Sequence, residues 1–416
     1  LDLAKRLGMR WLRNHDALQW TWWIRTEPQN DQWQWHDEEL GKLTDRGLLL
    51  LGEFLHCPAW AADAPPGIDL TGSHYLYSAY PPKDWAEFAE YVYETVRHYR
   101  DHIHNWEIWN EPYYNGFWKG TPEQYARLAK IAYRECKRAD PSCTVWGACT
   151  HLSAQDWLER ALEAGLGKSM DGLSMHGYSV SAALDSANNP YGGVGRLRNL
   201  LAKYGRPGVR IWDTEAGVPS TSFLDQHRAG VSEPDAKYHF RNAAAELVRM
   251  YVEHAAVGIE KLFYYNCIYT RQPWPARPES PKDKIDNGLM DVGGVIKPTG
   301  VAYATCAALL EDAKFEQRVD TPAGLRAYLF ARGDTTVGVV FGSFHSFAES
   351  RRVALALPDW APANEPAFRD VMNAKLLPKA LGQGQVEITI SRLPWFVSAR
   401  VPVEHVAAWL KGARKL

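Results

Sequence analysis

The chain of 416 residues is long enough for one large α/β barrel and a smaller second domain. Its hydrophobic content of 46% and charged content of 23% are typical of a globular protein. The formal net charge of -2 gives no reason to expect binding to nucleic acid or to an anionic membrane. No apolar run reaches the roughly 18 residues that a membrane-spanning helix needs, so a transmembrane protein is not expected.

The chain opens on residues 1–8, which have the pattern of the end of a helix, and a strand pattern follows directly. No signal peptide is visible, but a leader that had been removed would leave no trace. The localisation therefore stays open, and a secreted or periplasmic location is favoured if an N-terminal segment was removed.

Strand and helix patterns alternate through the first three hundred residues, which predicts a parallel sheet. The candidate strands are 9–14, 48–55, 105–111, 144–149, 171–178, 209–215 and 261–267. The candidate helices between them are 36–46, 83–100, 122–138, 154–164, 194–204 and 235–257. This order predicts a (β/α)8 TIM barrel in the α/β class. Because seven strands are found and the chain opens on a helix, we expect the barrel's first strand to be missing from this numbering.

Around residue 313 the pattern changes to strands without intervening helices. A hairpin is expected around Gly333 and Asp334, between strands at 325–332 and 335–343. Further strand patterns lie at 351–357, 385–391 and 394–400, and a terminal helix is expected at 403–413. The predicted domains are a catalytic barrel at 1–312, a small antiparallel, β-sandwich-like domain at 313–402, and a C-terminal helix and tail at 403–416.

The six cysteines contain no C-x-x-C pair and no metal-ligand spacing. We interpret them as free, buried thiols, although a Cys136–Cys143 bridge stays conceivable. Metalloprotease-type histidine pairs and calcium-loop patterns are also absent from the sequence, so neither a catalytic metal nor another cofactor is expected.

Two glutamates each close a candidate strand. The run at 106–112 reads as a short buried strand that ends at Glu111, because Pro112 cannot continue a central strand. The run at 209–217 ends in the same way at Glu215. In a parallel α/β barrel the catalytic groups lie at the carboxyl ends of the strands. Since retaining cleavage of a glycosidic bond needs two carboxyl groups about 5–5.5 Å apart, the pair predicts a retaining glycosidase.

The motif Trp-Glu-Ile-Trp-Asn-Glu-Pro at 106–112 resembles the acid/base motif of the clan A glycoside hydrolases. Two further motifs resemble family 39 of that clan: Arg13-Asn14-His15 is similar to its Arg-x-His, and His176-Gly177-Tyr178 to its sixth-strand His-x-Tyr. The segment from 287 to 298 resembles the exit from its eighth strand. Family 39 contains β-xylosidases and α-L-iduronidases, while family 5 and other members of the clan stay open as alternatives.

The resemblance implies a role for each matched residue. Glu111 matches the general acid/base, which clan A places after an asparagine, and Glu215 matches the nucleophile. Asn110 matches the asparagine that bonds the sugar 2-hydroxyl, and Tyr178 matches the tyrosine that holds the nucleophile. The other matched residues, Arg13, His15 and His176, are expected to position the substrate or the nucleophile. His56 is also expected to bind substrate, without a matching family motif.

Simple electrostatics favours the same assignment. An acid/base needs a pKa raised toward neutrality, whereas a nucleophile must stay ionised. Arg13 near Glu215 would favour the charged form of that glutamate. Glu107 is expected on the inward face of its strand, where a carboxylate needs a partner such as Arg13, and we interpret it as structural.

Eighteen tryptophans and twenty tyrosines suggest aromatic platforms for sugar rings, although a single ring more often serves ordinary packing. The best candidates lie at strand ends or in the loops after them, namely Trp60, Trp118, Tyr265 and Trp274. The insertion at 57–82 is rich in proline, glycine and aromatic residues, as a cleft wall would be.

The function predicted is hydrolysis of an oligo- or polysaccharide by double displacement. A transglycosylase would use the same residues, and a catalytically inert sugar-binding protein on the same fold is an alternative from another class. The sugar, the linkage and the oligomeric state stay open.

Overall fold

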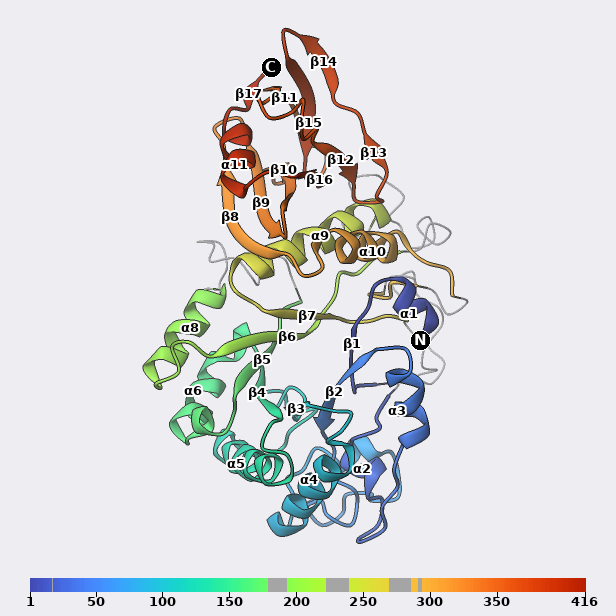
Figure 1. Ribbon diagram of the computed structural model, residues 1–416. Coiled ribbons are helices and arrows are strands. Elements are labelled where there is room, and N and C mark those ends of the chain that lie inside the picture. Colours follow the sequence, from blue (N-terminus) through green and yellow to red (C-terminus); the bar gives the residue numbers. More distant parts are fainter. Residues whose placement is uncertain (17, 179–192, 222–238, 269–285, 291–293) are drawn as a thin grey trace. The chain divides into compact units, whose positions relative to one another are not determined.

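Figure 1 shows the computed structural model, which describes residues 1–16, 18–178, 193–221, 239–268, 286–290 and 294–416. Two compact units are found, one containing Leu1–Lys5, Met9–Ala216 and Ile259–Phe263, the other Arg6–Gly8, Gly217–Gly258 and Tyr264–Leu416. Helices α9 (Phe240–Ala256) and α10 (Pro298–Leu310) belong to the same unit as the C-terminal strands. The predicted domain boundaries after residues 312 and 402 stay predictions.

The first unit is built on a seven-stranded sheet whose strands lie in chain order from β1 to β7. They are β1 (Trp11–Arg13), β2 (Leu49–Phe54), β3 (Asn105–Ile108), β4 (Thr144–His151), β5 (Gly172–His176), β6 (Arg210–Ala216) and β7 (Lys261–Tyr264). The pairs from β1 to β6 are parallel. Trp11 on β1 packs edge-on against Phe263 on β7, with ring centroids 6.3 Å apart, so the sheet is a nearly closed barrel. The predicted barrel is confirmed, and the place of its eighth strand stays a prediction.

The helices of this unit lie where the periodicity predicted them. They are α3 (Asp37–Thr44), α4 (Trp85–Tyr99), α5 (Pro122–Ala139), α6 (Gln155–Glu163) and α8 (Gly193–Lys203), with two short helices, α1 (Asp2–Arg6) and α2 (Trp23–Thr26), before them. Helix α5 shows how the local sequence determines where a helix begins and which face it buries. A capping box between Thr121 and Gln124 satisfies free N–H groups at its start, and Pro122 occupies a first-turn position where no donor is needed. Its buried face repeats at helical spacing through Tyr125, Leu128, Ala129, Ala132 and Cys136.

An aromatic layer fills one level of the barrel interior. Trp146 stacks on Trp212 with ring centroids 3.8 Å apart, and Trp11 packs edge-on against Trp212 at 5.5 Å. Leu51 and Phe263 complete this cluster. Because side chains two positions apart point to the same face of a strand, the residues two positions further along several of these strands form the next level, toward the carboxyl ends. That next level carries charged groups and forms the base of the site described below.

The second unit contains two antiparallel sheets, with strand orders β13-β12-β16-β10-β9-β8 and β14-β15-β11-β17. Their bounds are β8 (Lys314–Asp320), β9 (Leu325–Arg332), β10 (Thr335–Gly342), β11 (Ser350–Ala356), β12 (Ala367–Asp370), β13 (Lys375–Leu376), β14 (Lys379–Gly382), β15 (Gln385–Ser391), β16 (Trp395–Ala399) and β17 (Arg414–Lys415). The predicted hairpin between β9 and β10 is confirmed, as is the terminal helix, α11 (Val403–Lys411). Phe368 packs against both Trp395 and Trp409 in the core of this unit.

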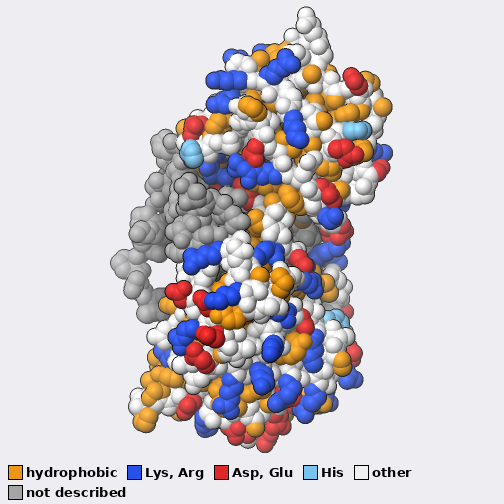
Figure 2. All heavy atoms as spheres, turned by 90° about the vertical axis from the view of Figure 1, so that its left-hand side faces the viewer, with side chains coloured by type: hydrophobic (Ala, Val, Ile, Leu, Met, Phe, Trp, Pro, Cys, Tyr) orange, Lys and Arg blue, Asp and Glu red, His pale blue; other side chains and the backbone are white. Residues whose placement is uncertain are grey.

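The visible surface has no dominant sign of charge. On the face shown in Figure 2, Lys and Arg side chains lie among Asp and Glu side chains, in keeping with the net charge of -2. Within the described ranges, none of the helices is both long and apolar enough to cross a membrane.

The aromatic layer makes Gly172 sensitive to substitution. A Cβ atom at this position would lie 2.2 Å from Cζ3 of Trp146. We expect Gly172→Ala to lower the free energy of unfolding by about 1–3 kcal/mol, because the stacked indoles cannot move aside without strain. Urea unfolding followed by tryptophan fluorescence measures this change. Gly208→Ala is the matched control, since a Cβ there meets nothing within 4 Å. Equal stability of the two variants would contradict the close packing around Trp146.

Candidate active site

The carboxyl ends of β2, β3 and β4 carry an unusual concentration of left-handed backbone. The φ angles are 62° at His56, 67° at Trp109, 40° at Glu111, 78° at Ala148 and 40° at Cys149. None of these residues is glycine, and each such conformation costs on the order of 1–3 kcal/mol. Strain of this kind gathers at functional sites, where it aims side chains that regular strands would turn elsewhere.

Arg13 on β1 is the hub of the site. Its Nε donates to Oε2 of Glu107 at 2.6 Å, its Nη1 to Oε2 of Glu215 at 2.6 Å, and its Nη2 to Oε1 of Glu53 at 2.9 Å. Nη2 also donates to Oδ1 of Asn110 at 2.8 Å. Burial alone would lower the pKa of Arg13, but the surrounding carboxylates raise it well above its ordinary value. One guanidinium therefore ties together the ends of β1, β2, β3 and β6.

Glu53 on β2 is a fully buried carboxylate that the sequence did not single out. Its Oε2 lies 2.9 Å from Nδ1 of His15 and accepts from Nε1 of Trp22 at 2.8 Å. Burial raises the pKa of Glu53, but Arg13 and His15 outweigh this effect and lower it. In turn, burial lowers the pKa of His15, and the Glu53 charge raises it above the ordinary value. This arrangement fixes the imidazole of His15 beside the site.

Glu107 on β3 is buried on the inward face, as expected, and its predicted pairing with Arg13 is confirmed. Its second oxygen accepts from the hydroxyl of Thr214 on β6 at 2.7 Å. Both carboxylate oxygens are thus satisfied, which a charge buried inside a barrel requires. The geometry agrees with a structural role for this residue.

Glu215 lies near the carboxyl end of β6 in a cationic environment. Arg13 donates to its Oε2, and the hydroxyl of Tyr178 donates to its Oε1, as the sequence led us to expect. Burial would raise the pKa of Glu215, but His176, Arg13 and the Tyr178 hydrogen bond lower it to about 2. Glu215 is therefore held as a carboxylate over the whole ordinary pH range.

Glu111 follows β3 and meets a different set of groups. Its Oε1 lies 2.8 Å from Nδ1 of His176 and accepts from the hydroxyl of Tyr113 at 2.7 Å. Burial raises the pKa of Glu111, but the hydrogen bond and charge of His176 outweigh this and lower it. The expectation of a raised pKa is wrong for the protein without substrate, because it left out the imidazole.

One imidazole links the two glutamates. His176 on β5 is completely buried, with Nδ1 on Glu111 and Nε2 at 3.9 Å from Oε2 of Glu215. Nε2 also lies 3.2 Å from Sγ of Cys149 on β4. The two carboxylates predicted from separate strands therefore belong to one site.

Three groups in this site were missed by the sequence reasoning: Glu53, Tyr113 and Cys149. Glu53 left a signal, since it is a charged residue inside the otherwise apolar run at 48–55. Tyr113 follows the acid/base motif without a distinguishing pattern. Cys149 was interpreted, like the other cysteines, as a free and buried thiol, because only the fold brings it to the other groups.

The remaining predicted substrate-binding residues differ in their burial and contacts. His56 is buried, with Nδ1 2.9 Å from the hydroxyl of Ser78, and its Nε2 has no hydrogen-bond partner among the described residues. Trp60 is half-buried and donates to the carbonyl of Glu27 at 3.1 Å. Tyr265 belongs to the second compact unit.

Trp118 and Trp274 were also predicted as sugar platforms. Trp118 is 2% exposed and packs against Trp109 and Tyr125, an environment of the core rather than of a sugar platform. Trp274 lies outside the described residues.

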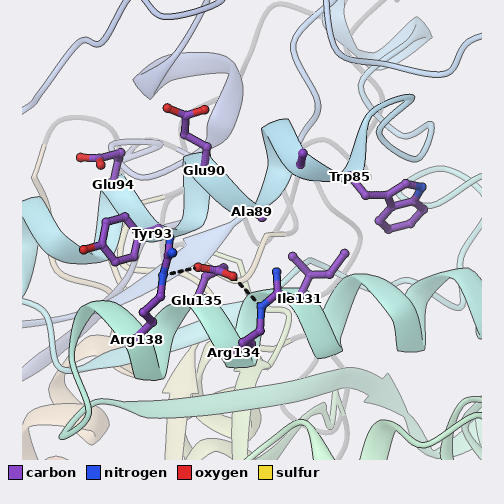
Figure 3. Close-up of a pocket in the computed structure, with 10 residues that line it drawn as sticks. Trp85, Ala89, Glu90, Tyr93, Glu94, Ile131, Arg134, Glu135 and Arg138 are labelled. Atoms are coloured by element: carbon purple, nitrogen blue, oxygen red, sulfur yellow. Dashed lines mark hydrogen bonds and ion pairs between the residues drawn. The ribbon is translucent and has the colours of Figure 1, made fainter.

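A hollow lies elsewhere on the first unit, between α4 and α5, with a volume of about 590 Å³ (Figure 3). Its centre is Glu135, whose two oxygens pair with Arg134 at 2.6 Å and Arg138 at 2.7 Å. The guanidinium of Arg138 lies 3.9 Å from the ring centre of Tyr93. Glu135 and the ring of Tyr93 are therefore already paired with arginines, and none of the residues of the carboxylate site lines this hollow.

The described ranges contain no group of three or more His, Cys, Asp or Glu side chains that could hold a metal ion. All six cysteines are free thiols, so the conceivable Cys136–Cys143 bridge is not formed.

The model of the glycosyl hydrolases family 39 matches residues 4–215. The chain belongs to this family. The predicted resemblance is thereby confirmed, and the matched segment includes both strand-closing glutamates.

Two β-xylosidases are similar to parts of this family 39 chain. That of Caldicellulosiruptor saccharolyticus is 30% identical over 126 residues, which are 28% of this chain and 25% of the relative. That of Geobacillus stearothermophilus is 25% identical over 197 residues, 43% of this chain and 38% of the relative. The chain thus covers well under half the length of these relatives.

The fold is also that of a solved family 39 glycoside hydrolase from Bacteroides cellulosilyticus, with a TM-score of 0.72. The alignment covers 96% of this chain and 77% of that one at 18% identity. At so low an identity the similarity concerns the fold alone.

The lowered pKa of Glu215 predicts a specific pH dependence of stability. Its value is about 2 in the folded chain against 4.5 for an ordinary glutamate. Ionised Glu215 therefore stabilises the fold above the ordinary value, and this contribution is lost as the pH falls toward the lower one. Between about pH 6 and about pH 3, we expect wild type to lose about 2 kcal/mol more free energy of unfolding than Glu215→Gln. Urea unfolding at both pH values measures the difference, and parallel losses would show that Glu215 titrates normally.

Proposed function

We propose that this family 39 chain is a retaining glycoside hydrolase in which Glu111 is the general acid/base and Glu215 the nucleophile. The observation that carries the proposal is the pair itself. Two glutamates at the carboxyl ends of β3 and β6 face the same imidazole, yet only Glu215 is bound by a guanidinium. Two carboxyl groups in different environments have different pKa values, so one can serve as the acid while the other stays ionised as the nucleophile.

In the first step of this mechanism, the carboxylate of Glu215 attacks the anomeric carbon. The bond to the leaving oxygen breaks, and that oxygen takes a proton from Glu111. The products are a free alcohol, the Glu111 carboxylate and a glycosyl ester on Glu215. In the second step Glu111 removes a proton from water, the oxygen of that water attacks the anomeric carbon, and Glu215 leaves as a carboxylate.

The contacts of Glu215 suit both steps. Arg13 and Tyr178 hold one carboxylate oxygen each, which fixes the direction of attack. They also stabilise the anion that must depart in the second step. The carboxylate of Glu111 is oriented by its own backbone, which has a left-handed φ of 40°, and not by Arg13.

The substrate proposed is a neutral oligo- or polysaccharide, with a β-xyloside as the first candidate because both curated relatives carry the name β-xylosidase. Asn110, held by Arg13 through Oδ1, would present its amide to a sugar hydroxyl. His15 and the free Nε2 of His56 would bind further hydroxyls from the β1 and β2 side. The acid, the base and the nucleophile of the proposed reaction are all side chains, so it calls on no cofactor.

The proposal is tested by replacing Glu215 with alanine. We expect the turnover of an aryl β-glycoside to fall by at least about 10⁴-fold, because no group remains to form the covalent intermediate. Added azide should restore part of the turnover and give the α-glycosyl azide, which is inverted relative to the substrate. Proton NMR of the product distinguishes the two anomers and would also reveal transfer to a second sugar.

Two further variants make this test specific. Glu111→Ala with azide should give the β-glycosyl azide, since the nucleophile is retained and the first step still occurs with a good leaving group. Glu260→Ala removes an exposed glutamate paired with Arg210 and should leave turnover unchanged. Wild-type activity in Glu215→Ala would overturn the assignment. Sugar binding without turnover in wild type would favour an inert binding protein.

A further inference from the structure

Cys149 is turned into the candidate active site by an irregularity in β4. The pairing of β4 with β5 shifts between Gly147 and Thr150, and both residues within the shift have left-handed backbone, with φ of 78° at Ala148 and 40° at Cys149. A β-bulge of this kind re-aims one side chain that the regular alternation would point elsewhere. The thiol that it delivers is completely buried.

The thiol contacts three side chains of the site, and the backbone of Glu111 also hydrogen-bonds to it. Sγ lies 3.2 Å from Nε2 of His176, 3.6 Å from Nη2 of Arg13 and 3.8 Å from Oδ1 of Asn110. Arg13 has only donors, so the sulfur is its acceptor. The single hydrogen of the thiol is then best placed toward the nearest acceptor, which is the Nε2 lone pair of His176.

We infer that Cys149 is a positioning residue that donates its S–H to Nε2 of His176, and so holds the imidazole neutral with Nδ1–H toward Oε1 of Glu111. The inference rests on the proposed function. The hydrogen bond at one imidazole nitrogen decides which nitrogen carries the proton. With a neutral imidazole donating to Oε1, the other oxygen of Glu111 is left to carry the acid proton.

The opposing influence comes from the charges that face His176. Glu111 and Glu215 favour the imidazolium, whereas Arg13 opposes it, and His151 on β4 is a further titratable neighbour. Burial lowers the pKa of His176, but the two carboxylates together raise it above its ordinary value. An imidazolium would hold Glu111 as a carboxylate, which is the wrong form for an acid.

The thiol is suited to this role because it stays protonated. Burial raises the pKa of Cys149 and the charge of Glu107 raises it further, while Arg13 acts in the other direction with a smaller effect. A protonated thiol suits a neutral imidazole, because its S–H can donate to the lone pair of Nε2. It suits an imidazolium less well, because the sulfur is only a weak acceptor for the N–H there.

The proton inventory of the first step follows from this arrangement. Before the step, Glu111 carries one proton, His176 carries one at Nδ1, and Cys149 carries one at Sγ. The Glu111 proton goes to the leaving oxygen, and the other two stay in place. The resulting Glu111 carboxylate keeps the Nδ1–H hydrogen bond and is ready to accept a proton from water.

The test compares Cys149→Ala with wild type on aryl β-glycosides of different leaving groups. Without the S–H donor, a larger share of His176 is present as the imidazolium. Glu111 then loses its acid proton at a lower pH. For a phenyl glycoside we expect kcat/KM near neutral pH to fall roughly five- to tenfold, and the basic limb of its pH profile to move down by up to about one unit. A dinitrophenyl glycoside needs no protonation, so its kcat/KM should change less than about twofold.

Cys149→Ser and Cys306→Ala complete the design. The serine hydroxyl is also a donor and should restore most of the phenyl-glycoside activity and the position of the basic limb. Cys306 is a buried thiol on α10, so its alanine variant controls for the loss of a buried sulfur. Equal loss on both substrates in Cys149→Ala, an unmoved basic limb, or no rescue by serine would overturn the inference.

These outcomes are distinguishable from a failure of the proposed function. If wild type hydrolyses neither glycoside, or if Glu215→Ala retains wild-type turnover, the glycosidase assignment fails first. If wild type is active and Glu215→Ala is not, but the leaving-group and pH effects of Cys149→Ala are missing, then the glycosidase assignment holds and only the role of Cys149 is excluded.

Discussion

The guanidinium of Arg13 is the constraint on which the site depends. From the short strand β1 it reaches the side chains of Glu53, Glu107 and Glu215, which come from three other strands of the same sheet. A cluster of buried carboxylates would otherwise repel and draw protons, because burial disfavours each charge. The planar guanidinium has five fixed donors and serves these three carboxylates and Asn110 at once, whereas the ammonium of a lysine has three donors. Below this ionic level the stacked indoles of Trp146 and Trp212 give it a rigid base.

The same hub makes the two strand-end glutamates unequal. Glu215 receives Arg13 directly, whereas Glu111 receives only the imidazole of His176 and the hydroxyl of Tyr113. One carboxylate is therefore strongly held as an anion, and the protonation of the other depends on a group that can itself titrate. The left-handed backbone at Glu111 and Cys149 shows that the fold accepts local strain to bring these groups together.

Much of the architecture could be predicted because it follows from local patterns. Alternating strand and helix periodicity gave the parallel barrel, and the loss of helical spacing after residue 313 gave the antiparallel β region. Helix α10 was not predicted, since its apolar residues run around the whole helix and leave no amphipathic stripe to recognise. The short strands β12 to β14 were missed because two to four residues carry too little pattern.

By itself the sequence determined the fold class, the resemblance to clan A and the two strand-closing glutamates, because a short motif, a proline after a buried run and a repeating apolar spacing are local properties. Only the tertiary structure decided which groups surround those glutamates. Glu53, Tyr113 and Cys149 join the site through the curvature of the sheet and the bulge in β4, neither of which leaves a mark in the spacing of residues. The pKa of Glu111 was misjudged for the same reason: a pKa is set by distances to charges such as His176, and those distances exist only once the strands have come together.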